Sequence, residues 1–392
     1  MLRFFGFLGA FLIFSNAFGQ DERIRQILQQ FSPDSVQIEL KRLSGEIPVK
    51  INGSTVTIKS RLYNNPGNNQ AFQYIKQQFT KYGMKTFSQS FSNNGVNLLG
   101  VKYGTIYPER FCIIGAHYDN LPTGAIAPGA DDNASGCAAV LEAARLLSTV
   151  DLANTVIFAA WDEEELGLIG SNDYVMNGID NDSFLGYINL DMIGWDGNGD
   201  RVTELHTRPI AQSINLAEMV LRCNEWYTIG LNLKVVNPGA INTDHYSFWQ
   251  GGHTAVGINE EYQGDLNPHY HQATDQFQYL DTAYLSANAR LAIAAITTLA
   301  FDKTQMGNPS EIADRAKIFP NPAEDLLTIQ FPHAIVAPFK VELADPQGRI
   351  VRSVTAAETF KITIPVDDLA KGAYSVIIRS ADFKSAYPFI KK

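Results

Sequence analysis

The sequence predicts an α/β fold with a mainly parallel central sheet covered by helices, followed by a small C-terminal all-β sandwich. From Phe111 to about Asn259, apolar runs that resemble buried strands alternate with amphipathic segments. Such alternation is typical of a parallel sheet built from strand–helix–strand units. After about Ile318 the alternation gives way to short strand-like runs separated by turn residues, as in a β-sandwich. The length of 392 residues also favours two domains.

The N-terminal segment predicts a removable signal peptide over residues 1–19. Arg3 precedes an apolar run from Phe4 to Phe14, and small residues at Ala17 and Gly19 suit a cleavage point. A membrane anchor is the alternative, but the run is shorter than the roughly 20 residues that a spanning helix needs. No later stretch is expected to cross a bilayer, so we expect no membrane span in the mature protein.

The first domain is predicted over residues 20–303. Its early part, from Arg23 to about Tyr82, has apolar side chains at helical spacing and predicts amphipathic helices. The alternating region follows with the segments FCIIGAH, SGCAAVLEAARLL, TVIFAAW, GYINLDM, AQSINLAEMVLRC and HTAVGIN. A further helix from about Tyr284 to Phe301 is expected to close the domain.

A polar stretch over residues 304–317, with Gly307 and Pro309, predicts a linker. The second domain is predicted over residues 318–392. Its strand-like runs are LLTIQF, FKVELAD, FKITIPV and AYSVIIRS, and the turn signal DPQG begins at Asp345.

Composition excludes some classes of function. The formal net charge is -10, from 41 acidic and 31 basic residues, and no basic run could follow a phosphate backbone. Nucleic acid is therefore not expected as a partner. The three cysteines, Cys112, Cys137 and Cys223, each lie in an apolar stretch. This pattern indicates buried small side chains and excludes a disulfide framework.

Polar residues follow the predicted strands of the first domain. His117 and Asp119 follow FCIIGA, three glutamates from Glu163 to Glu165 follow TVIFAAW, and Asp191 closes GYINL. The carboxyl ends of parallel strands meet at one edge of a sheet, where ligands bind. Carboxylates placed there repel one another unless a cation offsets their charge. The sequence therefore predicts a metal site.

Two further segments can contribute to this site. PGADDNASG contains Asp131 and Asp132, and NPHYHQATD contains His271. Imidazole and carboxylate ligands without thiolates suit zinc in an open catalytic site, with cobalt or manganese as possible substitutes. A lone HxD pattern would by itself indicate only an ordinary polar pair. The presence of all these pieces near predicted strand ends favours the metal site.

Six segments between about Asn64 and Phe301 resemble one known family. They are GAHYDN, APGADDNASG, DEEELGLIGS, NLDM, TDHYSF and NPHYHQATD. Together they resemble the zinc-dependent aminopeptidases with co-catalytic metals, which are relatives of glutamate carboxypeptidases, glutaminyl cyclases and transferrin-receptor-like proteins. The resemblance implies a metallopeptidase with two Zn²⁺ ions that removes N-terminal residues from peptides.

The resemblance also implies a set of metal ligands. His117, Asp132 and Asp191 would hold one ion, and Asp132, Glu165 and His271 would hold the other, so that Asp132 bridges the two. The three carboxylates would offset three of the four positive charges of two zinc ions.

Other roles follow from the same resemblance. Glu164 would be the general base acting on a water that bridges the metals, and Asp119 would accept a hydrogen bond from His117 and orient it. Asp131 is assigned a supporting role, and a cis peptide is expected between Asp132 and Asn133. Glu163 is expected to be a surface acid.

Substrate preference is less determined. Met192, directly after Asp191, and Tyr270, directly before His271, are candidates for the pocket wall. A carboxypeptidase or dipeptidase of the same family would need a basic residue for the substrate carboxylate, and Arg201 and Arg208 keep that alternative open. A glutaminyl cyclase and a non-catalytic surface receptor are further alternatives.

The C-terminal segments IFPNPAEDLLTIQF and GAYSVIIRSADFKSAYPFIKK resemble the sorting domain of proteins exported by type IX secretion. The resemblance implies passage through the periplasm to the cell surface or medium, with the type IX machinery as a partner. An accessory β-sandwich that binds substrate or carbohydrate is the alternative.

Overall fold

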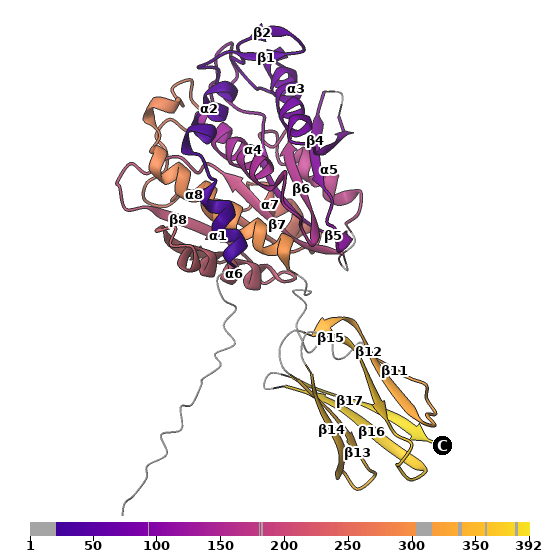
Figure 1. Cartoon of the computed structure of the whole chain (residues 1–392). Helices are drawn as coiled ribbons and strands as arrows, with labels where there is room; N and C mark the ends of the chain where they lie inside the picture. Colours follow the sequence, from indigo (N-terminus) through magenta and orange to yellow (C-terminus); the bar gives the residue numbers. More distant parts are fainter. Residues whose placement is uncertain are drawn as a thin grey trace, which may run out of the picture.

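The computed structural model describes residues 21–92, 94–179, 181, 183–302, 316–335, 339–356, 359–380 and 383–392 (Figure 1). The predicted signal peptide and residues 304–315 of the predicted linker lie outside these ranges.

An eight-stranded sheet forms the centre of the first domain, in the order β3-β4-β6-β5-β7-β10-β8-β9. Its four central strands pair in parallel. They are β6 (Asn154–Trp161), β5 (Tyr107–His117), β7 (Phe184–Asp191) and β10 (Ala255–Asn259). These strands lie on the four apolar runs that the sequence analysis identified, and the predicted α/β class is confirmed.

The edges of the sheet were not identified from the sequence. They are β3 (Lys85–Ser90), β4 (Val96–Lys102), β8 (Val202–His206) and β9 (Asn232–Val236). On one side β3 and β4 add antiparallel strands beside β6, and on the other β8 is antiparallel to β10 and parallel to β9. The two outer strands β3 and β9 contain no fully buried residue, so they lack the apolar runs that mark buried strands.

Helices cover both faces of the sheet (Figure 1). The core on one face includes residues of α1 (Glu22–Gln29), α2 (Pro33–Leu43), α3 (Pro66–Lys81), α4 (Gly136–Leu147), α6 (Ser213–Trp226) and α8 (Thr282–Phe301). Of these helices, α1 packs on α8, and α2 packs on α4 and α8. The other face packs against α5 (Ile169–Met176) and α7 (His245–Gln250). Alternate residues of β5 belong to these two cores, Ile114 to the first and Ile113 to the second, because successive side chains of a strand point to opposite faces.

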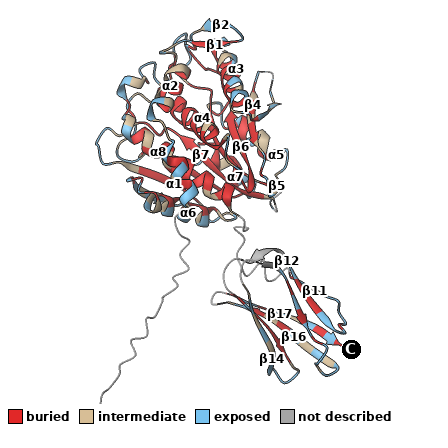
Figure 2. Cartoon of the chain, viewed as in Figure 1, coloured by how far each residue is buried: buried red, intermediate tan, exposed pale blue. Residues whose placement is uncertain are grey.

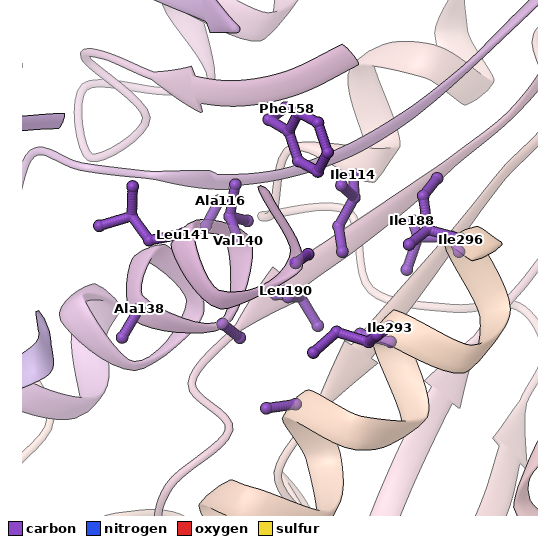
Figure 3. Close-up of a cluster of buried hydrophobic side chains, with 14 of the residues drawn as sticks. Ile114, Ala116, Ala138, Val140, Leu141, Phe158, Ile188, Leu190, Ile293 and Ile296 are labelled. Atoms are coloured by element: carbon purple, nitrogen blue, oxygen red, sulfur yellow. The ribbon is translucent and has the colours of Figure 1, made fainter. Parts of the chain in front are cut away.

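Figure 3 shows part of the larger core, where α4 and α8 pack over the central strands. Side chains from β5, β6 and β7 meet those of the two helices; the labelled ones are Ile114, Ala116, Phe158, Ile188, Leu190, Ala138, Val140, Leu141, Ile293 and Ile296. In Figure 2 the buried residues are concentrated in these strands and helices. The core therefore holds the carboxyl ends of the strands in fixed positions.

The sequence analysis expected only helices between Arg23 and about Tyr82, but this region also contains two strands. A short antiparallel pair, β1 (Val49–Ile51) and β2 (Ser54–Val56), lies between α2 and α3. Asn52 and Gly53 form its turn with φ of 49° and 86°. An Asn-Gly dipeptide between two short strands is the signal for such a hairpin.

Within the described ranges, α8 is long and apolar enough to suit a membrane span, with a hydropathy of 1.2, which the sequence analysis did not expect. In the structure 83% of that segment is buried, and the helix packs on β5, β6 and β7. Its apolar composition is therefore that of a core helix.

The C-terminal domain is an antiparallel β structure, as predicted. Its first sheet has the order β11-β12-β15, and its second has the order β14-β13-β16-β17. The strands are β11 (Lys317–Phe319), β12 (Leu326–Ile335), β13 (Phe339–Ala344), β14 (Ile350–Ala356), β15 (Thr359–Pro365), β16 (Gly372–Arg379) and β17 (Lys384–Lys391). Both sheets contribute to one separate hydrophobic core, which includes Leu327 and Val376.

Candidate metal centre

The polar residues that follow the strands gather at one edge of the sheet. His117 is the last residue of β5, and Asp191 is the last residue of β7. Glu164 and Glu165 lie just beyond the end of β6 at Trp161, which pairs with His117. The parallel pairing of these neighbouring strands brings their carboxyl ends together.

Asp132 reaches the same edge from the loop Ala130–Ser135, which precedes α4. The peptide bond between Asp132 and Asn133 is cis. The Asn133 side chain accepts a hydrogen bond from the Gly136 N–H and donates one to the Leu190 carbonyl, both at 2.9 Å. A Cβ on Gly136 would lie 2.7 Å from that carbonyl oxygen. Only glycine therefore allows the start of α4 to lie this close to β7.

Asp275 stabilises this loop through hydrogen bonds to its backbone. Its carboxylate accepts hydrogen bonds from the N–H groups of Asp131 and Asp132, each at 3.0 Å. Asp131 in turn accepts from the Gly194 N–H and the Asn267 amide. The Asp131 side chain therefore connects this loop to the loops that contain Gly194 and Asn267 and does not face the cluster.

The Asp132 carboxylate lies between two histidines. Its Oδ1 is 3.2 Å from Nε2 of His117, and its Oδ2 is 3.2 Å from Nε2 of His271. Asp191 lies 3.3 Å from Nε2 of His117, and Glu165 lies 2.9 Å from Nε2 of His271. Each histidine thus shares Asp132 and has a carboxylate neighbour of its own.

Two triplets of described residues have ligand atoms within 4.8 Å of one another: His117, Glu164 and Asp191, and His117, Asp132 and Glu165. They differ from the expected ligand sets, since Glu164 replaces Asp132 in the first and His117 replaces His271 in the second. The two triplets share His117 and comprise five side chains, and His271 joins them through Asp132 and Glu165, so all six form one continuous cluster.

The atoms of this cluster fit a metal site. Nε2 of His271 and Oε1 of Glu165 are buried but have no hydrogen-bond partner, although carboxylate oxygens lie close to the imidazole. Buried polar atoms are rarely left without a partner in native structures. Imidazole and carboxylate groups that converge in this way suit zinc.

The electrostatics of the cluster agree with this interpretation. Burial raises the pKa of Glu165 to about 7, and Asp132 adds to the rise. Burial also raises the pKa of Asp191. Burial lowers the pKa of His271, but Asp132 and Glu165 more than compensate and raise it to about 10. The buried carboxylates thus favour added positive charge, which a proton on the imidazole or a bound cation would supply.

Asp119 contacts both His117 and the two glutamates that follow β6. Nδ1 of His117 lies 3.2 Å from the Asp119 carbonyl oxygen and 3.5 Å from its carboxylate. The same carboxylate accepts hydrogen bonds from the N–H groups of Glu164 and Glu165, each at 3.2 Å. Asp119 therefore connects the end of β5 to the two glutamates that follow β6.

Glu163 is not the surface acid that the sequence analysis expected. It is buried, and its carboxylate accepts a hydrogen bond from the Ser92 hydroxyl at 2.8 Å. Its backbone φ is 54°. This left-handed conformation at the start of the turn directs Glu163 away from its two neighbours.

A cavity of about 180 Å³ opens beside the cluster. Its wall includes Met192 and Tyr270, the two pocket candidates from the sequence, and also Asn242, Tyr262 and Leu266, which the sequence analysis missed. Those three lie in loops beyond β9 and β10, where no strand pattern indicated them. The lining residues include no lysine or arginine.

The two arginines that left a carboxypeptidase as an alternative function form hydrogen bonds outside the cavity. Arg201 donates from Nε to the Gly230 carbonyl, and Arg208 donates to the Gly239 carbonyl. Neither belongs to the cavity wall. Asp244 and His245 of TDHYSF are buried, and neither lines the cavity.

The architecture and the cluster together define the zinc-exopeptidase-like class of α/β proteins. Residues 97–296 match peptidase family M28, and the chain belongs to this family. Residues 317–392 match the secretion system C-terminal sorting domain, which indicates an exported protein that is secreted or held at the cell surface.

Similar proteins include a probable leucine aminopeptidase of Arthroderma benhamiae, 32% identical over 49% of this chain and 54% of the relative. Another is leupeptin-inactivating enzyme 1 of Streptomyces exfoliatus, 28% identical over 61% of this chain and 57% of the relative. The chain thus spans about half the length of the curated relatives that it matches.

Solved structures share the fold. The LapA aminopeptidase of Legionella pneumophila has a TM-score of 0.62 and 22% identity, over 72% of this chain and 75% of that one. A Bacteroides thetaiotaomicron glutaminyl cyclase bound to N-acetylhistamine has a TM-score of 0.55 and 18% identity, over 68% of this chain and 98% of that one. Both kinds of enzyme therefore occur on this fold.

Proposed function

We propose that this protein is an exported two-zinc aminopeptidase that removes N-terminal residues from peptides. The observation that carries the proposal is the position of Asp132, which presents one carboxylate oxygen to each of two histidines at 3.2 Å. A carboxylate placed in this way suits a bridge between two metal ions.

His117, Asp132 and Asp191 would hold one ion, and Asp132, Glu165 and His271 would hold the other. When bound, the ions would polarise the peptide carbonyl and make a nearby water more acidic. Nε2 of His271 and Oε1 of Glu165, which make no hydrogen bond, support this assignment.

Glu164 is the proton carrier in this proposal. It lines the cavity, and its carboxylate lies 4.0 Å from Nε2 of His117. Burial raises the pKa of Glu164 well above its usual range, and Asp191 adds to the rise although His117 opposes it. A carboxyl group with a raised pKa can take a proton from water and return it to the leaving amine. Asp119 would keep Glu164 in place through the backbone.

The charge of the cavity favours recognition of an amino terminus. Four carboxylates line it, and among the described residues no lysine or arginine does. A terminal carboxylate would need an arginine or lysine, whereas a substrate α-ammonium needs neither and could pair with a carboxylate. This observation favours an aminopeptidase over a carboxypeptidase, and Asp132 between two histidines favours a two-metal enzyme over a cyclase.

Substrates with a free or an acetylated N-terminus should be separated strongly. We expect the free peptide to be cleaved about 100-fold faster, since a charged hydrogen bond contributes roughly 1.5–3 kcal/mol. Release of the N-terminal residue would be followed by mass spectrometry, with a C-terminally amidated peptide as the control that should be cleaved normally. Removal of C-terminal residues from the acetylated peptide would instead indicate a carboxypeptidase, and cyclisation of an N-terminal glutamine would indicate a cyclase.

Removal of residues 304–392 should leave a folded and active first domain. All residues of its two cores lie between Ile24 and Phe301, and the core of the C-terminal domain begins at Ala316. We expect peptidase activity within about twofold of the full chain but no delivery to the surface. Cooperative unfolding, activity and cell fractionation would test this; a truncated chain that fails to fold would contradict the domain boundary.

A further inference from the structure

Arg61 is a buried arginine beside the metal centre. Its exposed fraction is 1%. Its side chain donates four hydrogen bonds, and all four acceptors are backbone carbonyls: Nε to Tyr118, Nη1 to Leu43 and Pro128, and Nη2 to Gly129, at 2.7 to 2.8 Å. The planar guanidinium directs its donors in fixed directions, so it can hold several chain segments at once.

Two of these segments carry the proposed metal ligands. Tyr118 lies between His117 and Asp119, and Gly129 directly precedes the loop that contains Asp132. A single side chain therefore connects the end of β5 to the loop before α4. Asp132 and His117 must lie at a defined distance to share an ion, and the Arg61 hydrogen bonds join the backbone segments that carry them.

The packing around Arg61 leaves little freedom. The Asn120 side chain accepts from the Arg61 N–H at 2.9 Å and donates to the Ala127 carbonyl at 2.7 Å. Gly129 has a φ of 51°, and a Cβ there would lie 2.4 Å from Nδ2 of Asn120 and 2.9 Å from Nη2 of Arg61. The guanidinium and the Asn120 amide thus lie directly against the backbone of the loop.

The charge of the buried Arg61 guanidinium is compensated by its surroundings. Burial lowers the pKa of Arg61, while Cys137 and the carboxylates of Asp275 and Asp132 act in the opposite direction. A buried ion without partners would cost several kcal/mol. The four carbonyls and the nearby acidic cluster offset this cost.

We infer that Arg61 is a positioning residue that fixes the His117 segment relative to the Asp132 loop and thereby sets the metal affinity of the centre. The inference rests on the proposed function, because it uses the ligand assignment made there. Lysine keeps the charge but has a single nitrogen, so it cannot hold the same four carbonyls.

The test compares Arg61→Lys with Arg110→Lys in the full chain. Arg110 is also a buried arginine, 5% exposed, and lies near the start of β5. At about 3.3 Å per residue it is roughly 20 Å from His117. Zn²⁺ affinity would be measured by competition with a chromophoric chelator, and thermal unfolding of the metal-free protein would report the structural effect of each change.

We expect Arg61→Lys to weaken Zn²⁺ binding by about 10- to 100-fold, the usual effect of losing a residue that orients metal ligands. Arg110→Lys should lower the unfolding temperature without changing affinity. In the Co²⁺ form, the visible absorption bands should shift for Arg61→Lys and not for Arg110→Lys.

Each other outcome contradicts a definite statement. Unchanged Zn²⁺ affinity in Arg61→Lys, or an equal loss in Arg110→Lys, would overturn the positioning role alone. A wild-type chain that binds no metal would overturn the proposed function itself. If Arg61→Lys does not fold, Asn120→Ala removes two hydrogen bonds of the same assembly, and it should weaken Zn²⁺ binding in the same direction; normal affinity in that variant would also overturn the inference.

Discussion

Glu164→Gln should retain its metal ions and lose turnover by roughly 10²- to 10⁴-fold, the range for removal of a general base. Glutamine keeps the shape of the side chain but cannot carry a proton. Glu165→Gln should fail differently, because it removes a charged oxygen 2.9 Å from Nε2 of His271 and so should weaken one metal ion and lower stability. The two neighbouring substitutions therefore separate proton transfer from metal binding.

Metal analysis beside kinetics would decide between these roles. Glu163→Gln is the matched control, because Glu163 belongs to the same turn but does not line the cavity. As glutamine, the side chain could still accept a hydrogen bond from the Ser92 hydroxyl. We expect it to stay close to wild-type activity. If Glu164→Gln kept nearly full activity, or lost metal while Glu165→Gln kept it, the assignment of base and ligand would be wrong.

Removal of metal should abolish activity and destabilise the first domain. Glu164, Glu165 and Asp191 are held close together, and burial raises the pKa of each because the charged forms are disfavoured there. Cations relieve this repulsion in the folded state only. At 1,000 times the dissociation constant, a bound ligand adds about 4 kcal/mol to the free energy of unfolding.

Chelation followed by calorimetry and stepwise return of Zn²⁺ would measure both effects. We expect activity and unfolding temperature to recover as two ions bind per chain. The isolated C-terminal domain is the control, and its unfolding should not respond to zinc. Full activity after complete chelation would refute a metallopeptidase, and saturation at one ion per zinc-replete chain would refute the two-metal proposal.

Much of the candidate metal centre could be predicted because several of its residues lie at the ends of buried strands. Apolar runs identify β5, β6 and β7, and the parallel arrangement brings His117, Asp191 and the glutamates after Trp161 to one edge. Asp132 and His271 lie in loops, and no local pattern places them. Their assignment depended on the resemblance to a family, and their distances come from the structure alone.

The positive backbone φ of two residues near the candidate metal centre could not be predicted from the sequence pattern. Met192 and His271 have φ of 53° and 56°. Non-glycine residues pay roughly 1–3 kcal/mol in such sparsely populated regions, so surrounding contacts must hold them there. Propensity would place neither residue in this conformation.

Periodicity and turn residues along the chain were sufficient for the α/β class, the separate β domain and the strand-end position of the acids, because these features depend on neighbours in sequence. Three other features depended on the tertiary structure. They are the hydrogen bonds from Arg61 to Tyr118 and Gly129, the hydrogen bond from the Asp132 N–H to Asp275, and the position of Tyr262 in the cavity wall. The three hydrogen-bonded pairs are 57, 68 and 143 positions apart in the sequence. No local pattern records such pairs, since only packing of the whole domain brings them together.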